Sequence, residues 1–367
     1  MGPPAIKVLV LGASYGILPA VKLALAGHAV TIVAREEEIA AMACGPVQIE
    51  LAMRRTGRRI ILDAPVAAHP APGSVTLRPP AEAAADQADF ALLAMQEPHF
   101  AAPEVATLVA RLAAARVPCL SLMTLPPPPF LARLGTVPLS AIEGVFSAQE
   151  TWALLDPALV SVASPDAQAL RLDRARPGVL TVTLASNFKA APFADAAAQL
   201  LLERLARDMS HLQVQAGEKL VRPPVALIAA SSLHVPLAKW PMLLAGNCRS
   251  ITETGPRPIA DAVHADLPAS HALYDAVSDV VLRLGASRAD LVPFDAYARA
   301  AAQLARPSSL ARALESGAAN VERIDRLVLN LMRHFDQDDR SVAKISSLID
   351  ELLEANRRPG RGQPNRN

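Results

Sequence analysis

The stretch that decides the fold is KVLVLGASYG at residues 7–16, together with VTIVAR at residues 30–35. An apolar run ends in a glycine turn, a helix-like segment follows at 17–26, and a second apolar run ends in Arg35. Two apolar runs separated by a turn and a helical segment are typical of a β-α-β unit. The sequence therefore predicts a strand, a tight turn, a helix and a second strand at the start of the chain.

The glycine turn of this unit has the features of a phosphate site. Glycine lets a backbone come close to a pyrophosphate, and the N–H groups and dipole of the following helix favour an anion. The turn is one residue shorter than a full G-x-G-x-x-G fingerprint, with Ser14 in the second glycine slot. An ordinary βα turn that binds no nucleotide is the alternative. The residues expected to contact a dinucleotide are Gly12, Ser14, Tyr15 and Gly16.

The end of the second strand indicates which dinucleotide binds. NAD sites place an aspartate or glutamate there for the ribose 2′-hydroxyl, whereas an arginine accommodates the 2′-phosphate of NADP. Arg35 occupies this position, so the sequence favours NADP(H) as cofactor. The three glutamates at 36–38 are expected to face water in the first turn of the next helix.

Composition excludes several classes of partner. The chain has 367 residues, enough for two domains, and its net charge of +1 shows no field that would attract nucleic acid or an anionic membrane. Its three cysteines are scattered without metal-ligand spacing, so we expect free thiols, no metal site and a cytoplasmic protein. No apolar run has the length of a membrane helix, and the N-terminal run lacks the cleavage site of a signal peptide.

The first half of the chain alternates short apolar runs with alanine-rich stretches, as expected of a parallel sheet. The expected strands lie at residues 7–11, 28–34, 59–62, 90–95 and 118–123, with a second set at 141–146, 159–163 and 179–184. The four prolines at 126–129 predict an extended loop after a strand, because proline disrupts both helix and central strand.

The second half of the chain has helical periodicity, with prolines between the helical segments. The expected helices lie at residues 195–209, 237–246, 269–284, 294–304, 309–316 and 320–335. The sequence therefore predicts an α/β protein with an N-terminal Rossmann-type parallel-sheet domain and an all-helical C-terminal domain. The expected division is a NADP-binding domain at 1–193, a helical substrate and dimerisation domain at 194–356, and a disordered tail at 357–367.

Three segments carry a resemblance to a known family. They are residues 10–16 with 26–35, KWPMLLAGNC at 239–248, and PSSL at 307–310 followed by NVERID at 320–325. Together they resemble the ketopantoate reductase (2-dehydropantoate 2-reductase) family of the 6-phosphogluconate dehydrogenase-like superfamily. The resemblance implies an NADPH-dependent reductase of a small 2-oxo acid, and analogy also suggests a homodimer.

Reduction of a 2-oxo acid needs a proton donor for the forming alkoxide and polar groups that hold the substrate. The resemblance implies a lysine as this donor and a glutamate that orients the substrate hydroxyl or the lysine. Lys239 and Glu322 are the candidates for these two roles. The candidate substrate ligands are Asn247, Ser309 and Thr124, and Gln96 at the end of the fourth strand is a further candidate cofactor contact. The alternative for Ser309 is to cap the helix that follows it.

The chain departs from the family pattern at positions that would do chemistry. Met242 stands two residues after Trp240, where the family has its lysine, and Ala313 stands where the family has an aspartate. The segment at 123–126 also replaces the family's asparagine-glycine loop. Two other functions therefore stay open: a NADP-binding sensor or scaffold without reductase chemistry, and an opine-type dehydrogenase that acts on an imine.

Overall fold

The computed structural model describes residues 4–43, 45–52, 59–164, 168–173 and 175–358. Contacts between Cα atoms divide the chain into two compact units. The first unit comprises residues 1–95, 99–133 and 148–233, and the second comprises residues 96–98, 134–147 and 234–367. The first unit extends past the boundary expected at residue 193, because the helix and strands that follow Phe193 pack within it.

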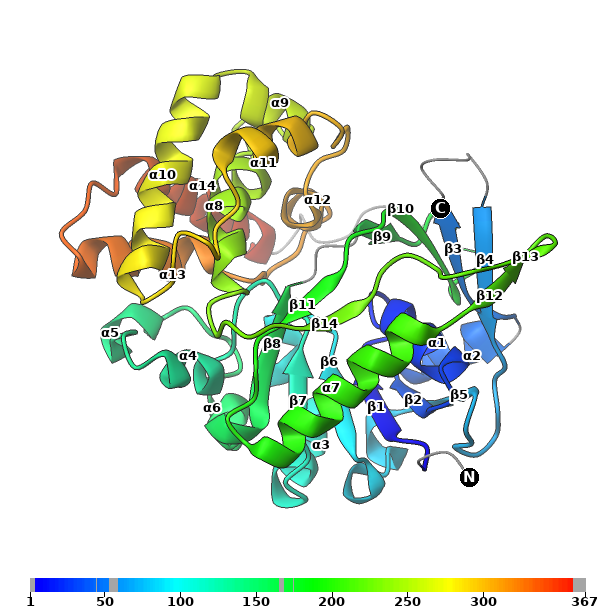
Figure 1. The fold of residues 1–367 in the computed structure, drawn as a ribbon. Helices are drawn as coiled ribbons and strands as arrows, with labels where there is room; N and C mark the ends of the chain where they lie inside the picture. Colours follow the sequence, from blue (N-terminus) through cyan, green and yellow to red (C-terminus); the bar gives the residue numbers. More distant parts are fainter. Residues whose placement is uncertain (1–3, 44, 53–58, 165–167, 174, 359–367) are drawn as a thin grey trace. The chain divides into compact units, whose positions relative to one another are not determined.

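An eight-stranded sheet forms the centre of the first unit (Figure 1), with the order β14-β11-β8-β7-β6-β1-β2-β5. Its strands are β1 (Lys7–Leu11), β2 (Ala29–Val33), β5 (Ser74–Arg78), β6 (Phe90–Leu93), β7 (Cys119–Ser121), β8 (Val160–Ser164), β11 (Phe188–Ala190) and β14 (Leu227–Ala229). All neighbours from β5 through β8 are parallel, whereas β11 runs antiparallel to β8. This parallel core confirms the predicted Rossmann-type fold.

A second sheet has the order β4-β3-β10-β9. Its strands are β3 (Val47–Ala52), β4 (Arg59–Ala64), β9 (Gln168–Leu170) and β10 (Val179–Leu184). The strands expected at 59–62 and 179–184 therefore exist, but their expected place in the main sheet was wrong. The alternation of exposed and buried residues along β4 is the sign that was overlooked, since a strand in a covered parallel sheet is apolar on both faces.

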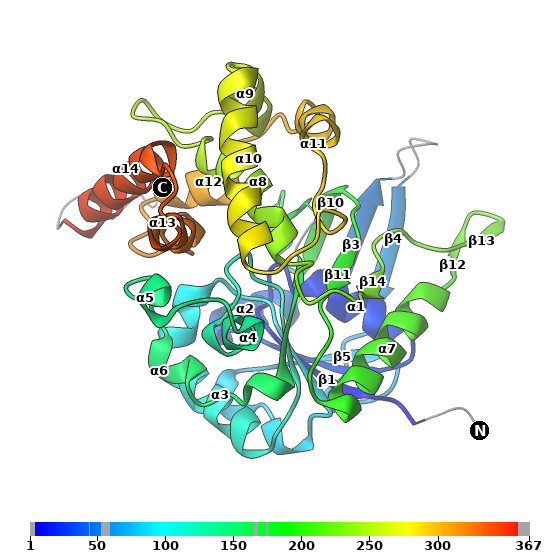
Figure 2. The same ribbon diagram turned by 60° about the vertical axis from the view of Figure 1, so that its left-hand side comes forward.

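Helix α1 (Ile17–Leu25) lies between the two sheets. It contacts β2 and β5 of the main sheet and also β3 and β4 of the second sheet, and residues 17–24 are all buried. Enclosure on both sides explains why ILPAVKLAL is apolar all round rather than amphipathic. Figure 2 shows α1 and α7 on one side of the main sheet, with α3 and α6 on the other.

The first 233 residues also form several helices, a hairpin and 3₁₀ turns besides the two sheets and α1. Outside the sheets they are α2 (Glu36–Ala43), α3 (Pro103–Ala114), α4 (Pro128–Leu134), α6 (Gln149–Trp152), α7 (Ala196–His211) and the hairpin β12 (Val214–Ala216) and β13 (Lys219–Val221), with 3₁₀ turns at Pro80–Glu82, Ala85–Gln87, Glu97–Ala101 and Pro157–Leu159. Asp195 caps α7 by accepting a hydrogen bond from the N–H of Ala198 at 2.8 Å. The extended loop expected at 126–129 was wrong in its second half, because α4 begins at Pro128 and proline is well suited to a first helical turn.

The second unit is helical in its described residues. Its elements are α5 (Leu139–Ile142), η5 (Leu237–Lys239), α8 (Trp240–Met242), the π-helix η6 (Leu243–Cys248), α9 (Ile259–His264), α10 (Leu267–Arg283), α11 (Phe294–Ala301), α12 (Ser309–Glu315), α13 (Ile324–His334) and α14 (Arg340–Arg357). The strand expected at 141–146 was wrong, since α5 covers part of it. The helical pattern expected throughout 194–356 was also wrong between residues 214 and 229, where β12, β13 and β14 lie.

The disordered tail was expected to begin at residue 357, but the structure has this residue in a helix. Arg357 is the last residue of α14, and residues 359–367 lie outside the described part. No helix in the described residues is long and apolar enough to cross a membrane.

Lys22 is the one charged side chain inside α1, and its amine ties the helix to the loop before β14. Its Nζ donates hydrogen bonds to the carbonyls of Pro223 at 3.3 Å, Pro224 at 2.8 Å and Val225. Desolvation by burial lowers the pKa of Lys22 from 10.5 to about 7.

We expect Lys22→Met to lower the free energy of unfolding by about 2 to 4 kcal/mol, because buried carbonyls lose their donor. Between pH 7 and pH 10 the unfolded chain binds more protons at Lys22 than the folded chain does, so this residue makes wild-type stability rise with pH. The deficit of Lys22→Met should therefore grow from pH 7 to pH 9 in urea titrations. The exposed Lys189→Met is the control, and an equal loss in both variants would contradict this role.

Candidate active site

The glycine turn between β1 and α1 is built by two close backbone contacts. Gly12 has a φ of +116°, and a Cβ added to it would lie 2.7 Å from Met95 Cγ. A Cβ on Gly16 would lie 2.2 Å from the carbonyl oxygen of Gly12. Both positions therefore require glycine, one for the turn and the other for close packing of the helix onto the strand.

The turn also presents hydrogen-bond donors suited to a phosphate group. Ser14 is exposed, and within the described part of the chain the N–H groups of Ser14 and Gly16 donate no hydrogen bond to the backbone or to a side chain. They lie directly before Ile17, where α1 begins and where its dipole favours an anion. The Tyr15 ring packs edge-on against Phe188 of β11, with ring centroids 5.9 Å apart. The turn thus fits the pyrophosphate of a dinucleotide.

Arg35 lies two residues after β2 and directly before α2, at the edge where a ribose would be recognised. Its side chain is 68% exposed and pairs with two carboxylates, with Nη1 at 3.0 Å from Glu37 and Nε at 3.3 Å from Glu38. The expectation that all three glutamates at 36–38 face water was wrong for Glu38, which is half-buried. A second arginine, Arg171, also contacts Glu38.

Lys239 and Met242 lie one turn apart in the second unit, on η5 and α8. Lys239 is half-buried, and its Nζ lies 4.0 Å from the sulfur of Met242. Met242 therefore contacts the lysine that the sequence predicts as proton donor.

Two glutamates of the second unit accept hydrogen bonds from backbone N–H groups of other segments. The Oε1 atom of Glu322 accepts a hydrogen bond from the backbone N–H of Glu97 at 3.3 Å. Glu97 itself is fully buried, and its Oε2 atom accepts from the N–H of Ser147 at 3.1 Å. Glu97 was not among the residues predicted from the sequence, although Gln96 directly before it was predicted as a site residue at the end of a strand. Gln96 is exposed and belongs with Glu97 to the second unit.

The neighbour of Glu322 has a structural role. Arg323 binds the buried Asp325 through two hydrogen bonds, at 3.0 Å from Nε and 2.7 Å from Nη2, and it also binds Asp350 on α14. These contacts fix the chain immediately before α13. The segment NVERID therefore has one residue that accepts a hydrogen bond from the backbone of Glu97 and two residues that anchor the helix.

The structure places the candidate substrate ligands as follows. Ser308, not Ser309, caps α12, because its Oγ accepts from the N–H of Ala311 at 3.0 Å. Ser308 Oγ also donates to the carbonyl of Asn247 at 2.8 Å, while Ser309 is exposed at the start of the helix. The side-chain amide of Asn247 is half-buried and makes no hydrogen bond within the described residues. Thr124 is half-buried in the first unit, after β7.

The π-helix η6 carries Asn247, and one tyrosine supports the start of this helix. The hydroxyl of Tyr297 donates to the carbonyl of Met242, the residue directly before η6, at 3.1 Å. Gly246 makes room for this contact, because a Cβ there would lie 2.0 Å from the Tyr297 oxygen. Burial raises the pKa of Tyr297, so its hydroxyl stays protonated and able to donate. Short π-helices are frequent at functional sites.

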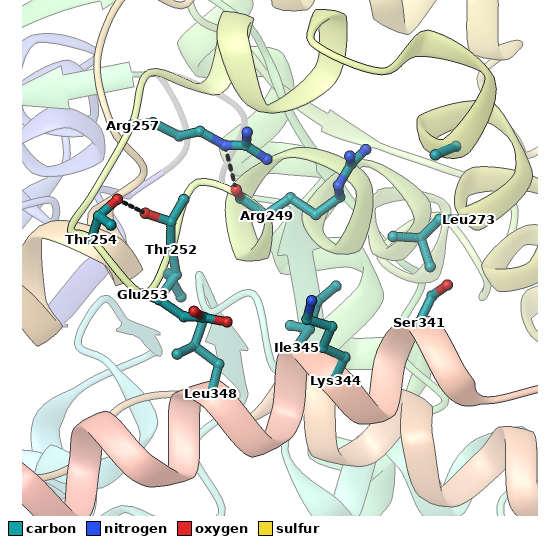
Figure 3. A pocket seen from close by; sticks show the side chains of 12 residues that line it. Arg249, Thr252, Glu253, Thr254, Arg257, Leu273, Ser341, Lys344, Ile345 and Leu348 are labelled. Carbon is teal, nitrogen blue, oxygen red and sulfur yellow. Dashed lines mark hydrogen bonds between the residues drawn. The ribbon is translucent and has the colours of Figure 1, made fainter.

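A cavity of about 500 Å³ lies elsewhere in the second unit (Figure 3). Its lining is Arg249, Ile251, Thr252, Glu253, Thr254, Arg257, Ala269, Leu273, Ser341, Lys344, Ile345 and Leu348. None of the candidate catalytic or substrate residues is among them. The cavity is therefore not the site that the sequence predicts.

The cysteines have no features of a reactive or metal site in the described residues. Cys119 and Cys248 are fully buried, and burial raises the pKa of the Cys119 thiol to about 12. Cys44 lies outside the described residues. Within the described part, no three His, Cys, Asp or Glu side chains are grouped to hold a metal ion.

Solved structures match the chain over nearly its whole length. A ketopantoate reductase of the PanE/ApbA family from Ralstonia eutropha JMP134 matches with a TM-score of 0.65 at 16% identity, covering 96% of this chain and 100% of that one. The chain has the ketopantoate reductase fold. A D-mandelate dehydrogenase with NADH and anilino(oxo)acetate matches with a TM-score of 0.62 at 9% identity, covering 96% and 99%.

A dimeric ketopantoate reductase from Staphylococcus aureus matches with a TM-score of 0.59 at 9% identity, covering 96% of this chain and 100% of that one. No protein-family model matches the sequence, and no curated protein matches it either. The fold predicted from the sequence is therefore confirmed by structures of very low sequence identity.

We expect Gly246→Ala to lower the free energy of unfolding by about 1 to 3 kcal/mol, because its Cβ would displace the buried Tyr297 hydroxyl. In a Tyr297→Phe background the same substitution should lower the free energy of unfolding by less, because phenylalanine lacks the hydroxyl oxygen that the added Cβ would meet. A Tyr274→Phe background is the control, since that hydroxyl donates instead to the carbonyl of Val292 at 2.6 Å. Equal costs in all three backgrounds, measured by chemical denaturation, would contradict the contact.

Proposed function

We propose that this chain is an NADPH-dependent reductase of a small 2-oxo acid. The observation that carries the proposal is the glycine turn with Arg35 after β2, in a chain that has the ketopantoate reductase fold. Structures with this fold include reductases and dehydrogenases of 2-oxo and 2-hydroxy acids, one of them with NADH bound. We also propose a homodimer, by analogy with the dimeric neighbour.

The cofactor would be held at the turn and at Arg35. The N–H groups of Ser14 and Gly16, with the N-terminus of α1, would bind the pyrophosphate, and the guanidinium of Arg35 would bind the 2′-phosphate. Tyr15 and Gln96 are proposed to complete the cofactor site. NADPH, once bound, would supply the hydride.

The second unit would supply the proton and the substrate contacts. We assign proton donation to the alkoxide to Lys239 Nζ, the most basic group among the candidate residues of this unit. Glu322 would orient the substrate or the lysine, and its place beside the N–H of Glu97 fixes its carboxylate. Asn247 and Ser309 would hold the substrate carboxylate. The amide of Asn247 has donors available for this, since it makes no hydrogen bond within the described part of the chain. Thr124, which belongs to the first unit, is proposed as a further substrate ligand.

Met242 at the family's lysine position favours a second candidate function, a NADP-binding protein without reductase chemistry. Activity decides between the two, because both candidates bind the cofactor. An opine-type dehydrogenase is distinguished by turnover that requires an amine in addition to the 2-oxo acid.

We expect the purified protein to oxidise NADPH with at least one member of a panel of small 2-oxo acids, ketopantoate included. Lys239→Ala should lower kcat/KM about a hundredfold or more, the usual contribution of a positioned general acid. The exposed Lys344→Ala in the same unit is the matched control and should retain full activity. Binding of NADPH without oxidation on any substrate would favour the second candidate function.

We expect Arg35→Ala to weaken NADPH binding about tenfold while leaving NADH binding within about twofold, since only NADPH carries the 2′-phosphate. Isothermal titration calorimetry with both nucleotides measures this directly. The same loss for the two nucleotides, or no loss for NADPH, would remove Arg35 from its proposed role.

A further inference from the structure

Glu38 lies between two guanidinium groups at the start of α2. Its Oε2 atom is 3.3 Å from Arg35 Nε, and its Oε1 atom is 3.4 Å from Arg171 Nη1. The side chains of Glu38 and Arg171 are both only 23% exposed. Burial raises the pKa of Glu38, but the hydrogen bonds and charges of the two arginines outweigh burial and hold the pKa below its usual value.

Arg171 reaches this position from the second sheet. It follows β9 directly, and its Nη2 atom donates to the carbonyl of Ala13 inside the glycine turn. One side chain thus connects three segments that are far apart in sequence: the turn after β1, the first turn of α2, and the end of β9. A guanidinium has five N–H donors, and these two contacts use two of them.

The two guanidiniums of this group share the carboxylate of Glu38. Arg35 has a second partner in Glu37, whose exposed side chain lies 3.0 Å away. A phosphate has three acceptor oxygens and up to two negative charges, so it satisfies two guanidiniums better than one carboxylate does. The group lies after β2, where dinucleotide-binding folds recognise the ribose 2′ substituent.

Resting on the function proposed above, we propose that Arg171 is a second ligand of the cofactor's 2′-phosphate and that Glu38 is the internal counter-ion that this phosphate displaces. Glu38 therefore opposes NADPH binding by competing for both arginines. It also has the carboxylate that would accept a hydrogen bond from the 2′-hydroxyl of NADH. The balance between Glu38 and the two arginines sets the preference between the two nucleotides.

The test is nucleotide binding by calorimetry, with NADPH, NADH and the fragment adenosine 2′,5′-bisphosphate as probes. Arg171→Met should weaken NADPH and the bisphosphate about tenfold, and NADH by no more than about twofold. Glu38→Gln should strengthen NADPH several-fold and should not strengthen NADH. Arg171→Lys keeps the charge but loses the forked geometry, so it should fall between wild type and Arg171→Met.

Two controls separate these effects from general loss of charge. Arg176→Met removes a nearby arginine that pairs with Glu50 at 2.7 Å instead of with the glycine turn, and it should leave binding unchanged. Glu36→Gln removes an exposed acid of the same helical turn and should also have little effect. Thermal unfolding of each variant shows whether the second sheet remains folded.

Three results would overturn the inference. NADPH affinity unchanged in Arg171→Met would remove the residue from the cofactor site, and equal losses for NADPH and NADH would assign it to the pyrophosphate. Weaker NADPH binding in Glu38→Gln would contradict the counter-ion role. Intact binding without turnover would overturn only the reductase function, whereas a wild-type protein that binds none of the probes would overturn both proposals.

Discussion

The packing of the first unit depends on the close approach of α1 and its preceding turn to the backbone of neighbouring strands. Gly12 and Gly16 allow the turn and the helix to lie against β1 and against the residues that follow β6, with no room for a Cβ at either position. The second sheet then covers the opposite side of the helix, so that its buried residues are shared by two sheets. An enclosed helix has no polar face, and the Lys22 amine is satisfied by backbone carbonyls instead of by water. The same enclosure brings a side chain of the second sheet to the beginning of α1.

The parallel core, the glycine turn and most of the helices of the second unit could be predicted from the sequence. Apolar runs with glycine turns and three- to four-residue periodicity are local signals, and they set β1, α1, α10 and α13 to within a few residues. Sheet membership could not be predicted, because β10 pairs with β3, which lies far away in the sequence. β4 pairs antiparallel with β3 just before it, and β3 was not among the expected strands. The short α5 was mistaken for a strand because its few apolar residues fit either periodicity.

The candidate site shows the same division between local and distant information. Gly12, Gly16 and Arg35 could be selected because their roles depend on positions within one β-α-β unit. Glu97 could have been found by extending the strand-end argument by one residue. Arg171 had no local signal, since its contacts with Ala13 and Glu38 arise only when the second sheet folds over the turn. Ser308 and Ser309 were confused because adjacent serines fit a cap equally well, and backbone geometry alone decides between them.

The π-helix η6 changes how spacing along this segment should be compared with that of other proteins. Residues five apart, not four apart, lie one turn from each other in a π-helix. Asn247 is five residues after Met242, so it stands about one turn beyond the position where the family has its lysine. Within such a segment a five-residue step makes the backbone contact that a four-residue step makes in an α-helix. Spacings across this segment should therefore be compared by helical turns rather than by residue number.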